Sequence, residues 1–196
     1  MNTKNGNKLL SVDDVETMNI NQIKNLYKKH VNPGIEKILS SFTVGKDLFE
    51  SADGVYMFTS DKKKILDVTG GIGVLNHGHN NEKILKVRIN HQNKKRMEVN
   101  KLVFSQYVAG LSFNISQLLP NELNKVFFCN SGAEANEGAL KIAYRYHKGK
   151  RKYVLHAENA FHGKLIGTGS ISGNYAEKFN FPFFKIGKTF KINELE

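Results

Sequence analysis

The stretch from Lys125 to Glu158 constrains the fold most, because two short apolar runs flank a helical pattern there. "KVFFCN" (Lys125–Asn130) and "YVLHAE" (Tyr153–Glu158) are typical of buried strands. Between them small and apolar side chains recur at helical spacing, at Ala135, Ala139, Ile142, Ala143 and Tyr146. A strand, a helix and a second strand predict a βαβ unit, whose crossover implies a parallel sheet. We therefore expect an α/β protein.

The junction between the first strand and the helix reads N-S-G-A. Ligands of open α/β sheets bind at the carboxyl ends of the strands, where a helix N-terminus offers free N–H groups to an anion. Gly132 lets a ligand approach the backbone, Ser131 supplies a hydroxyl, and the small Ala133 leaves its own N–H accessible. These features suit a phosphate. Ser131 could equally be an ordinary helix cap with Glu134 closing a capping box, and the spacing leaves both interpretations open.

The rest of the chain predicts further local elements. A helix with Ile20, Ile23 and Tyr27 on one face should end at "NPG" and be followed by an extended arm. Apolar runs at 55–58 and 65–68 predict a hairpin, which a glycine-rich loop at 69–80 follows. Two more helices are expected, around 84–91 and 108–119, the second ending before Pro120.

Composition narrows the class of protein. Hydrophobic residues make up 40% and charged residues 24%, close to soluble globular averages. We see neither a spanning apolar run nor a signal peptide, so we expect a cytoplasmic protein without a membrane partner. The net charge of +11 includes basic clusters at 90–96 and 148–152. Both clusters lack aromatic residues and are typical of solvated helix ends, so nucleic acid is a rival interpretation but not an expected partner.

Other chemistries are weakly indicated. The glycine clusters fit neither the P-loop nor the dinucleotide fingerprint. His77 and His79 have no cysteine or carboxylate at ligand spacing, so no metal site is expected. The single cysteine, Cys129, is interpreted as a small buried hydrophobe without chemistry.

Three motifs carry a resemblance to a known family. "DVTGGIGVLNHGHNNEKIL" (67–85), "FFCNSGAEANEGALKIA" (127–143) and "AFHGKLIGTGSISG" (160–173) resemble, in order and separation, the fold-type I class III aminotransferases. The resemblance runs from about Leu26 to the last residue. "YKKHVNPG" (27–34) and "FHGK" (161–164) further resemble the putrescine aminotransferase branch.

This resemblance implies a pyridoxal 5′-phosphate enzyme. Ser131 and the N–H groups of Gly132 and Ala133 would hold the cofactor phosphate, Phe161 would stack on the pyridine ring and His162 would lie beside it. We expect Glu134 and Glu137 to be solvated carboxylates that favour the helix dipole.

Lys164 bears on the substrate. It stands where many relatives have an arginine that grips an α-carboxylate, and lysine cannot make that planar two-pronged contact. A diamine donor resembling putrescine, a 2-oxo acid acceptor and a homodimer are therefore the implied partners. Acetylornithine, ornithine and 4-aminobutyrate donors are the alternative.

The family's aldimine lysine and its pyridine-binding Asp are expected beyond this chain, so we assign no catalytic residue within it. We expect an N-terminal helix and arm (1–50), a hairpin and glycine loop (51–79) and the first, incomplete part of a large domain with a mostly parallel sheet (80–196). A catalytically silent folded remnant is the alternative to an enzyme.

Overall fold

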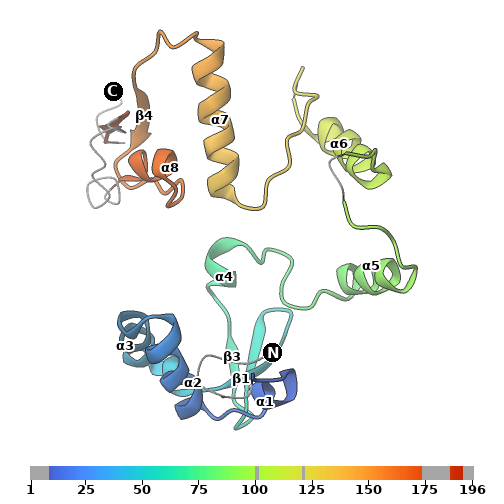
Figure 1. The fold of residues 1–196 in the computed structure, drawn as a ribbon, viewed down its shortest axis with the longest axis vertical. Helices are drawn as coiled ribbons and strands as arrows, with labels where there is room; N and C mark the ends of the chain where they lie inside the picture. The colour runs from blue at the N-terminus through green and yellow to red at the C-terminus, as the bar shows by residue number, and fades with distance from the viewer. Residues whose placement is uncertain (1–8, 100–101, 121, 174–185, 192–196) are drawn as a thin grey trace. The chain divides into compact units, whose positions relative to one another are not determined.

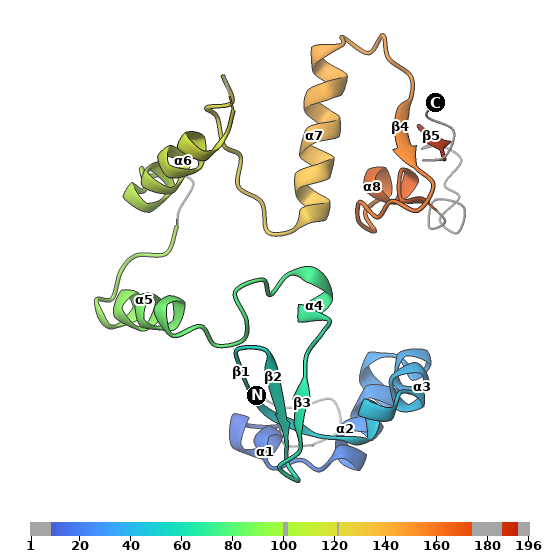
Figure 2. The same ribbon diagram turned by 180° about the vertical axis from the view of Figure 1, so that it is seen from behind.

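The computed structural model describes residues 9–99, 102–120, 122–173 and 186–191. They fall into two compact units, one up to Glu98 and one from Val99. The ribbon is drawn from opposite sides in Figures 1 and 2.

Helices open the first unit: α1 (Val12–Glu16), α2 (Ile20–Leu26), a π-helical turn (Tyr27–Val31), α3 (Pro33–Ser41) and a 3₁₀ turn (Thr43–Lys46). The side chain of Asn32 caps α3, accepting hydrogen bonds from the N–H groups of Gly34 at 2.7 Å and Ile35 at 3.2 Å. Pro33 occupies the first helical position, where no N–H is needed. "NPG" therefore ends one helix and begins another, and the predicted extended arm is wrong over α3.

An antiparallel sheet follows, with strands in the order β1 (Phe49–Asp53), β2 (Tyr56–Thr59) and β3 (Lys64–Leu66). The predicted hairpin is confirmed, with Met57 opposite Ile65. Strand β1 was not predicted because "FESAD" contains no apolar run. The three strands can be followed in Figure 2.

The glycine-rich loop contains a short turn, α4 (Gly70–Gly73), before helix α5 (Glu82–Asn93). All four residues of α4 have positive φ angles, between 50° and 77°. Glycine adopts this left-handed conformation freely, whereas a residue with a Cβ pays about 1–2 kcal/mol. Ile72, at φ 65°, carries that strain with a side chain that is 93% exposed.

The second unit contains α6 (Gln106–Leu118), α7 (Gly132–Tyr146), β4 (Val154–Ala157), α8 (Ile166–Ser170) and β5 (Gly187–Phe190). Strand β4 pairs in parallel with β5, from Val154 opposite Gly187 to Ala157 opposite Phe190. The expected α/β class with parallel pairing is confirmed, and helix α6 ends before Pro120 as predicted.

The predicted strand at Lys125–Asn130 is wrong. A strand requires hydrogen bonds to a neighbour, and within the described residues this segment pairs with none. Its side chains consequently lie near the surface: Phe127 is 73% exposed and Cys129 half-buried, which contradicts the expected burial of the cysteine.

The best-buried part of the second unit surrounds α8. Ile171 is the one hydrophobic side chain fully buried among the described residues, at 5% exposure. The buried polar residues of this unit are His156, Thr168 and Ser172, among those the structure describes. Helix α8 packs beside α7, as Figure 1 shows.

Candidate functional site

The first turn of α7 is fixed by a side-chain cap. The hydroxyl oxygen of Ser131 accepts a hydrogen bond from the N–H of Glu134 at 3.2 Å. The carboxylate of Glu134 accepts from the N–H of Asn130 at 2.7 Å, one residue earlier than a capping box requires. The cap by Ser131 is therefore confirmed, and the reciprocal half of the predicted box is displaced.

The N–H groups of Gly132 and Ala133 lie at the start of α7. Within the described part of the chain, neither Gly132 nor Ala133 donates its N–H to another residue. A Cβ built on Gly132 would meet no atom within 4 Å, so there is open space beside this turn. Free N–H groups at the positive end of a helix dipole favour an anion, and a phosphate group therefore fits here.

The loop between β4 and α8 contacts this first turn of α7. The side-chain amide of Asn136, on α7, donates to the carbonyl oxygen of His162 at 3.1 Å. Gly163 has φ 124°, and a Cβ there would come within 2.5 Å of the Cβ of Ala133. The structure thus brings the segment Phe161–Gly163 against the first turn of α7, which joins the two groups of predicted site residues.

The side chains of this loop differ in exposure. Phe161 is 59% exposed and His162 is half-buried. Lys164, the predicted substrate residue, is exposed and directly follows the packed Gly163.

A buried hydroxyl anchors the same loop to α8. The Oγ of Ser172 accepts from the N–H of His162 at 2.9 Å and lies 2.8 Å from the carbonyl oxygen of Thr168 and 3.0 Å from that of Gly163. The Ser172 side chain is completely buried. Sequence reasoning missed this residue, although a serine within "GTGSISG" was a signal for a polar contact in a closely packed turn.

Glu137 does not have the predicted role. Its Oε1 accepts hydrogen bonds from the N–H groups of Gly167 at 2.7 Å and Thr168 at 3.0 Å, at the N-terminus of α8. The residue at the N-cap of α8, Leu165, has no side-chain acceptor. The expectation of a solvated carboxylate is wrong because the buried N–H groups of another helix take the place of water.

A second polar cluster lies in the first unit. One oxygen of Asp67 accepts from Thr69 and Gly70, and the other lies 2.9 Å from Nε2 of His79. Hydrogen bonds from Thr69, then from His79, hold the pKa of Asp67 well below its usual range. Nδ1 of His77 lies 2.8 Å from the carbonyl oxygen of Gly78. Over the described ranges no three His, Cys, Asp or Glu side chains group as metal ligands would.

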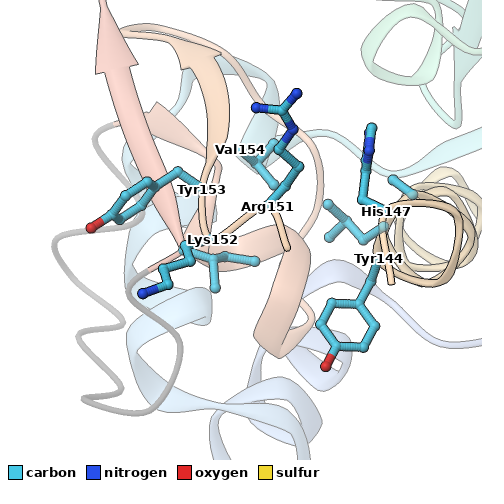
Figure 3. Close-up of a pocket in the computed structure, with 9 residues that line it drawn as sticks. Tyr144, His147, Arg151, Lys152, Tyr153 and Val154 are labelled. Carbon is cyan, nitrogen blue, oxygen red and sulfur yellow. The ribbon is translucent and has the colours of Figure 1, made fainter. Parts of the chain in front are cut away.

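The second unit also holds a cavity of about 450 Å³ between the C-terminal half of α7 and the start of β4. Figure 3 shows its wall, which includes Tyr144, His147, Arg151, Lys152, Tyr153 and Val154. No predicted site residue lines it among those the structure describes, and we do not assign it to the candidate site.

Comparisons with known proteins identify the family. The family model for class III aminotransferases matches residues 44–192. Acetylornithine aminotransferase from Prochlorococcus marinus subsp. pastoris is 34% identical over 170 residues, which cover 84% of this chain and 40% of that protein.

Solved structures agree in fold. The (S)-enantioselective omega-transaminase from Thermomicrobium roseum superposes with a TM-score of 0.74 at 22% identity, covering 89% of this chain and 40% of that one. Ornithine aminotransferase from Toxoplasma gondii gives 0.73 at 18% identity, with 93% and 42% covered. The taurine:2-oxoglutarate aminotransferase from Bifidobacterium kashiwanohense, solved with pyridoxal phosphate and glutamate, gives 0.72 at 20% identity, with 89% and 38% covered.

The chain belongs to the class III aminotransferase family and has the fold-type I architecture. Pyridoxal 5′-phosphate is the cofactor of this family. The chain spans about 40% of the length of the curated relative that it matches. None of the helices in the described ranges combines the length and the apolar character that crossing a membrane requires.

Proposed function

We propose that the first turn of α7 binds the phosphate of pyridoxal 5′-phosphate in a class III aminotransferase. The observation that carries this proposal is that no described residue accepts a hydrogen bond from the N–H groups of Gly132 and Ala133, and that there is open space at Gly132. Ser131 adds its hydroxyl at the same turn. When bound, the cofactor supplies an electron sink for amino-group transfer.

In this proposal the loop before α8 contacts the rest of the cofactor. Phe161 stacks on the ring, and stacking fixes the ring plane against which the reacting bond must be oriented. His162 lies beside the ring, held by Asn136 through its carbonyl group and by Ser172 through its N–H. The packing of Gly163 on Ala133 supports this assignment, because it keeps both segments at one place.

We test the cofactor site with pyridoxamine 5′-phosphate, which has no aldehyde and cannot react with lysines. The wild-type chain is titrated by calorimetry and compared with Ser131→Ala. Loss of a charge-assisted hydrogen bond costs about 1.5–3 kcal/mol, so affinity should fall roughly tenfold to a hundredfold. Ser116→Ala is the matched control, since its hydroxyl donates to the carbonyl oxygen of Phe113 and accepts from the side-chain amide of Gln117, both within α6. No saturable binding by the wild type would refute the proposal.

The donor in the complete protein is proposed to be an ω-amino compound, and the acceptor a 2-oxo acid. The similar proteins include an acetylornithine aminotransferase, an ornithine aminotransferase and an omega-transaminase, which support this class of donor. A diamine such as putrescine is favoured by the resemblance of segments 27–34 and 161–164 and by Lys164, which stands where many relatives have an arginine. Acetylornithine or ornithine agrees with the relatives at least as well. Comparing kcat/KM for putrescine and acetylornithine decides between the two donors.

The proposal includes a homodimer and a cytoplasmic location. Apolar residues around the glycine loop support self-association: Val68 is 83% exposed, Ile72 93% and Val74 69%. Light scattering after size exclusion measures the oligomeric state. A monomer at all concentrations would contradict the proposed dimer, and a stable protein that binds cofactor without transferring amino groups would favour the silent remnant.

A further inference from the structure

We propose that Glu137 is a positioning residue for the cofactor. By capping α8 it holds the loop Phe161–Gly163, which contacts the cofactor ring in the proposed function, in place against the first turn of α7, which binds the phosphate. The inference rests on the proposed function. Glu137 is on α7, five residues after Gly132, and its carboxylate binds the N-terminus of α8.

Helix α8 depends on this contact. It has five residues, whereas isolated helices shorter than about 12 residues are marginal in water. The N–H groups of Gly167 and Thr168 are in buried residues, and Thr168 is completely inaccessible. Without Glu137 these two donors would be left unpaired away from water, so α8 must shift or open.

A shift of α8 reaches the loop through Ser172. This residue binds the carbonyl oxygen of Thr168 on one side and the N–H of His162 on the other. A movement of the helix therefore moves His162 and its neighbour Phe161. The first turn of α7 is held by its own local contacts at Ser131 and Glu134, which do not involve α8.

This arrangement separates two kinds of ligand. Inorganic phosphate requires only the first turn of α7, whereas pyridoxamine 5′-phosphate requires that turn and the loop together. Loss of Glu137 should therefore weaken pyridoxamine 5′-phosphate much more than inorganic phosphate. A general loss of structure would weaken both ligands equally.

The experiment measures the dissociation constants of both ligands by calorimetry in the 196-residue chain. We expect Glu137→Ala to weaken pyridoxamine 5′-phosphate at least tenfold and inorganic phosphate less than threefold. Glu137→Gln keeps an acceptor oxygen and should recover most of the lost affinity. Glu82→Ala is the matched control, because Glu82 is likewise a helical glutamate near the N-terminus of its helix, and its 86% exposed carboxylate pairs with Lys86 and not with another helix in the described part of the chain.

A second variant keeps the carboxylate but displaces it. A Cβ on Gly167 would lie 2.7 Å from Oε2 of Glu137, so Gly167→Ala should push the side chain away and reproduce the selective loss. In the Glu137→Ala background the same substitution has room and should change affinity less than twofold.

The outcomes are distinct. A wild-type chain that binds neither ligand refutes the proposed function. A wild-type chain that binds both, with Glu137→Ala weakening both by the same factor or neither, overturns the positioning role and leaves the proposed function standing. Equal effects of Gly167→Ala in both backgrounds would also overturn it.

Discussion

Gly163→Ala tests whether the close approach of the two site segments is a requirement of the fold. The new Cβ would lie 2.5 Å from the Cβ of Ala133 and 3.0 Å from Oγ1 of Thr168. The φ angle of 124° is also one that residues with a Cβ rarely adopt. Strain of about 1–2 kcal/mol and overpacking of about 1–3 kcal/mol together predict a loss of roughly 2–5 kcal/mol.

Hydrogen–deuterium exchange of the amides at 160–173 measures this loss locally. At 1.36 kcal/mol for each factor of ten, a loss of about 2 kcal/mol raises the exchange rates roughly 30-fold. Ala133→Gly removes the nearest atom that the new Cβ meets but leaves Oγ1 of Thr168 and the φ angle unchanged. The double variant should therefore recover part of the overpacking loss of about 1–3 kcal/mol, a measurable coupling between the two positions.

Gly132→Ala is the control, because a Cβ there meets no atom within 4 Å and its exchange should stay within threefold of the wild type. If Gly163→Ala exchanged as slowly as this control, the packing of the loop on α7 would not be what fixes the site.

Three further predictions concern other parts of the chain. Asp67 has a folded-state pKa below its unfolded value of 3.8, so the stability it contributes is present above that pH and is lost as the pH falls further. The free energy of unfolding, measured by circular dichroism, should therefore decrease less with falling pH in Asp67→Asn than in the wild type. The same decrease in both proteins would show that the cluster of Asp67 with His79 contributes nothing to stability. Ile72→Gly should stabilise the glycine loop by up to ~1 kcal/mol by relieving a left-handed β-branched residue, and a lower urea midpoint would contradict this. If the complete protein has the proposed activity, Lys164→Arg should raise kcat/KM for donors with an α-carboxylate relative to putrescine by roughly tenfold to a hundredfold, since a guanidinium offers two parallel donors. An unchanged ratio would make Lys164 an ordinary surface residue.

Local pattern predicted the elements whose causes are local. The helices α5, α6 and α7 have caps and periodic apolar positions, and the hairpin of β2 and β3 has a polar turn between two apolar runs. The cap at Ser131 was likewise predicted from four consecutive residues. In each case the residues that decide the structure are neighbours in the chain.

The features that the sequence did not predict depend on contacts between residues far apart in the chain. Lys125–Asn130 has the composition of a strand, but pairing with a neighbour decides whether a strand forms. Glu137 looks in the sequence like any carboxylate near the start of a helix, and its partners lie 30 and 31 residues away. Ser172 is similarly defined by contacts with His162 and Gly163, which helical or strand spacing does not reveal.

The cap that α7 provides for α8 also imposes an order on folding. Because Glu137 must already be in place before the N–H groups of Gly167 and Thr168 have their acceptor, α8 is stabilised only after α7 has formed and docked. Bringing Glu137 and α8 together closes a loop of about 30 residues, and this costs conformational entropy that the short helix cannot offset by itself. We therefore expect α8 and the loop before it to acquire protection late, while α7, which leaves the ribosome first, forms on local contacts alone.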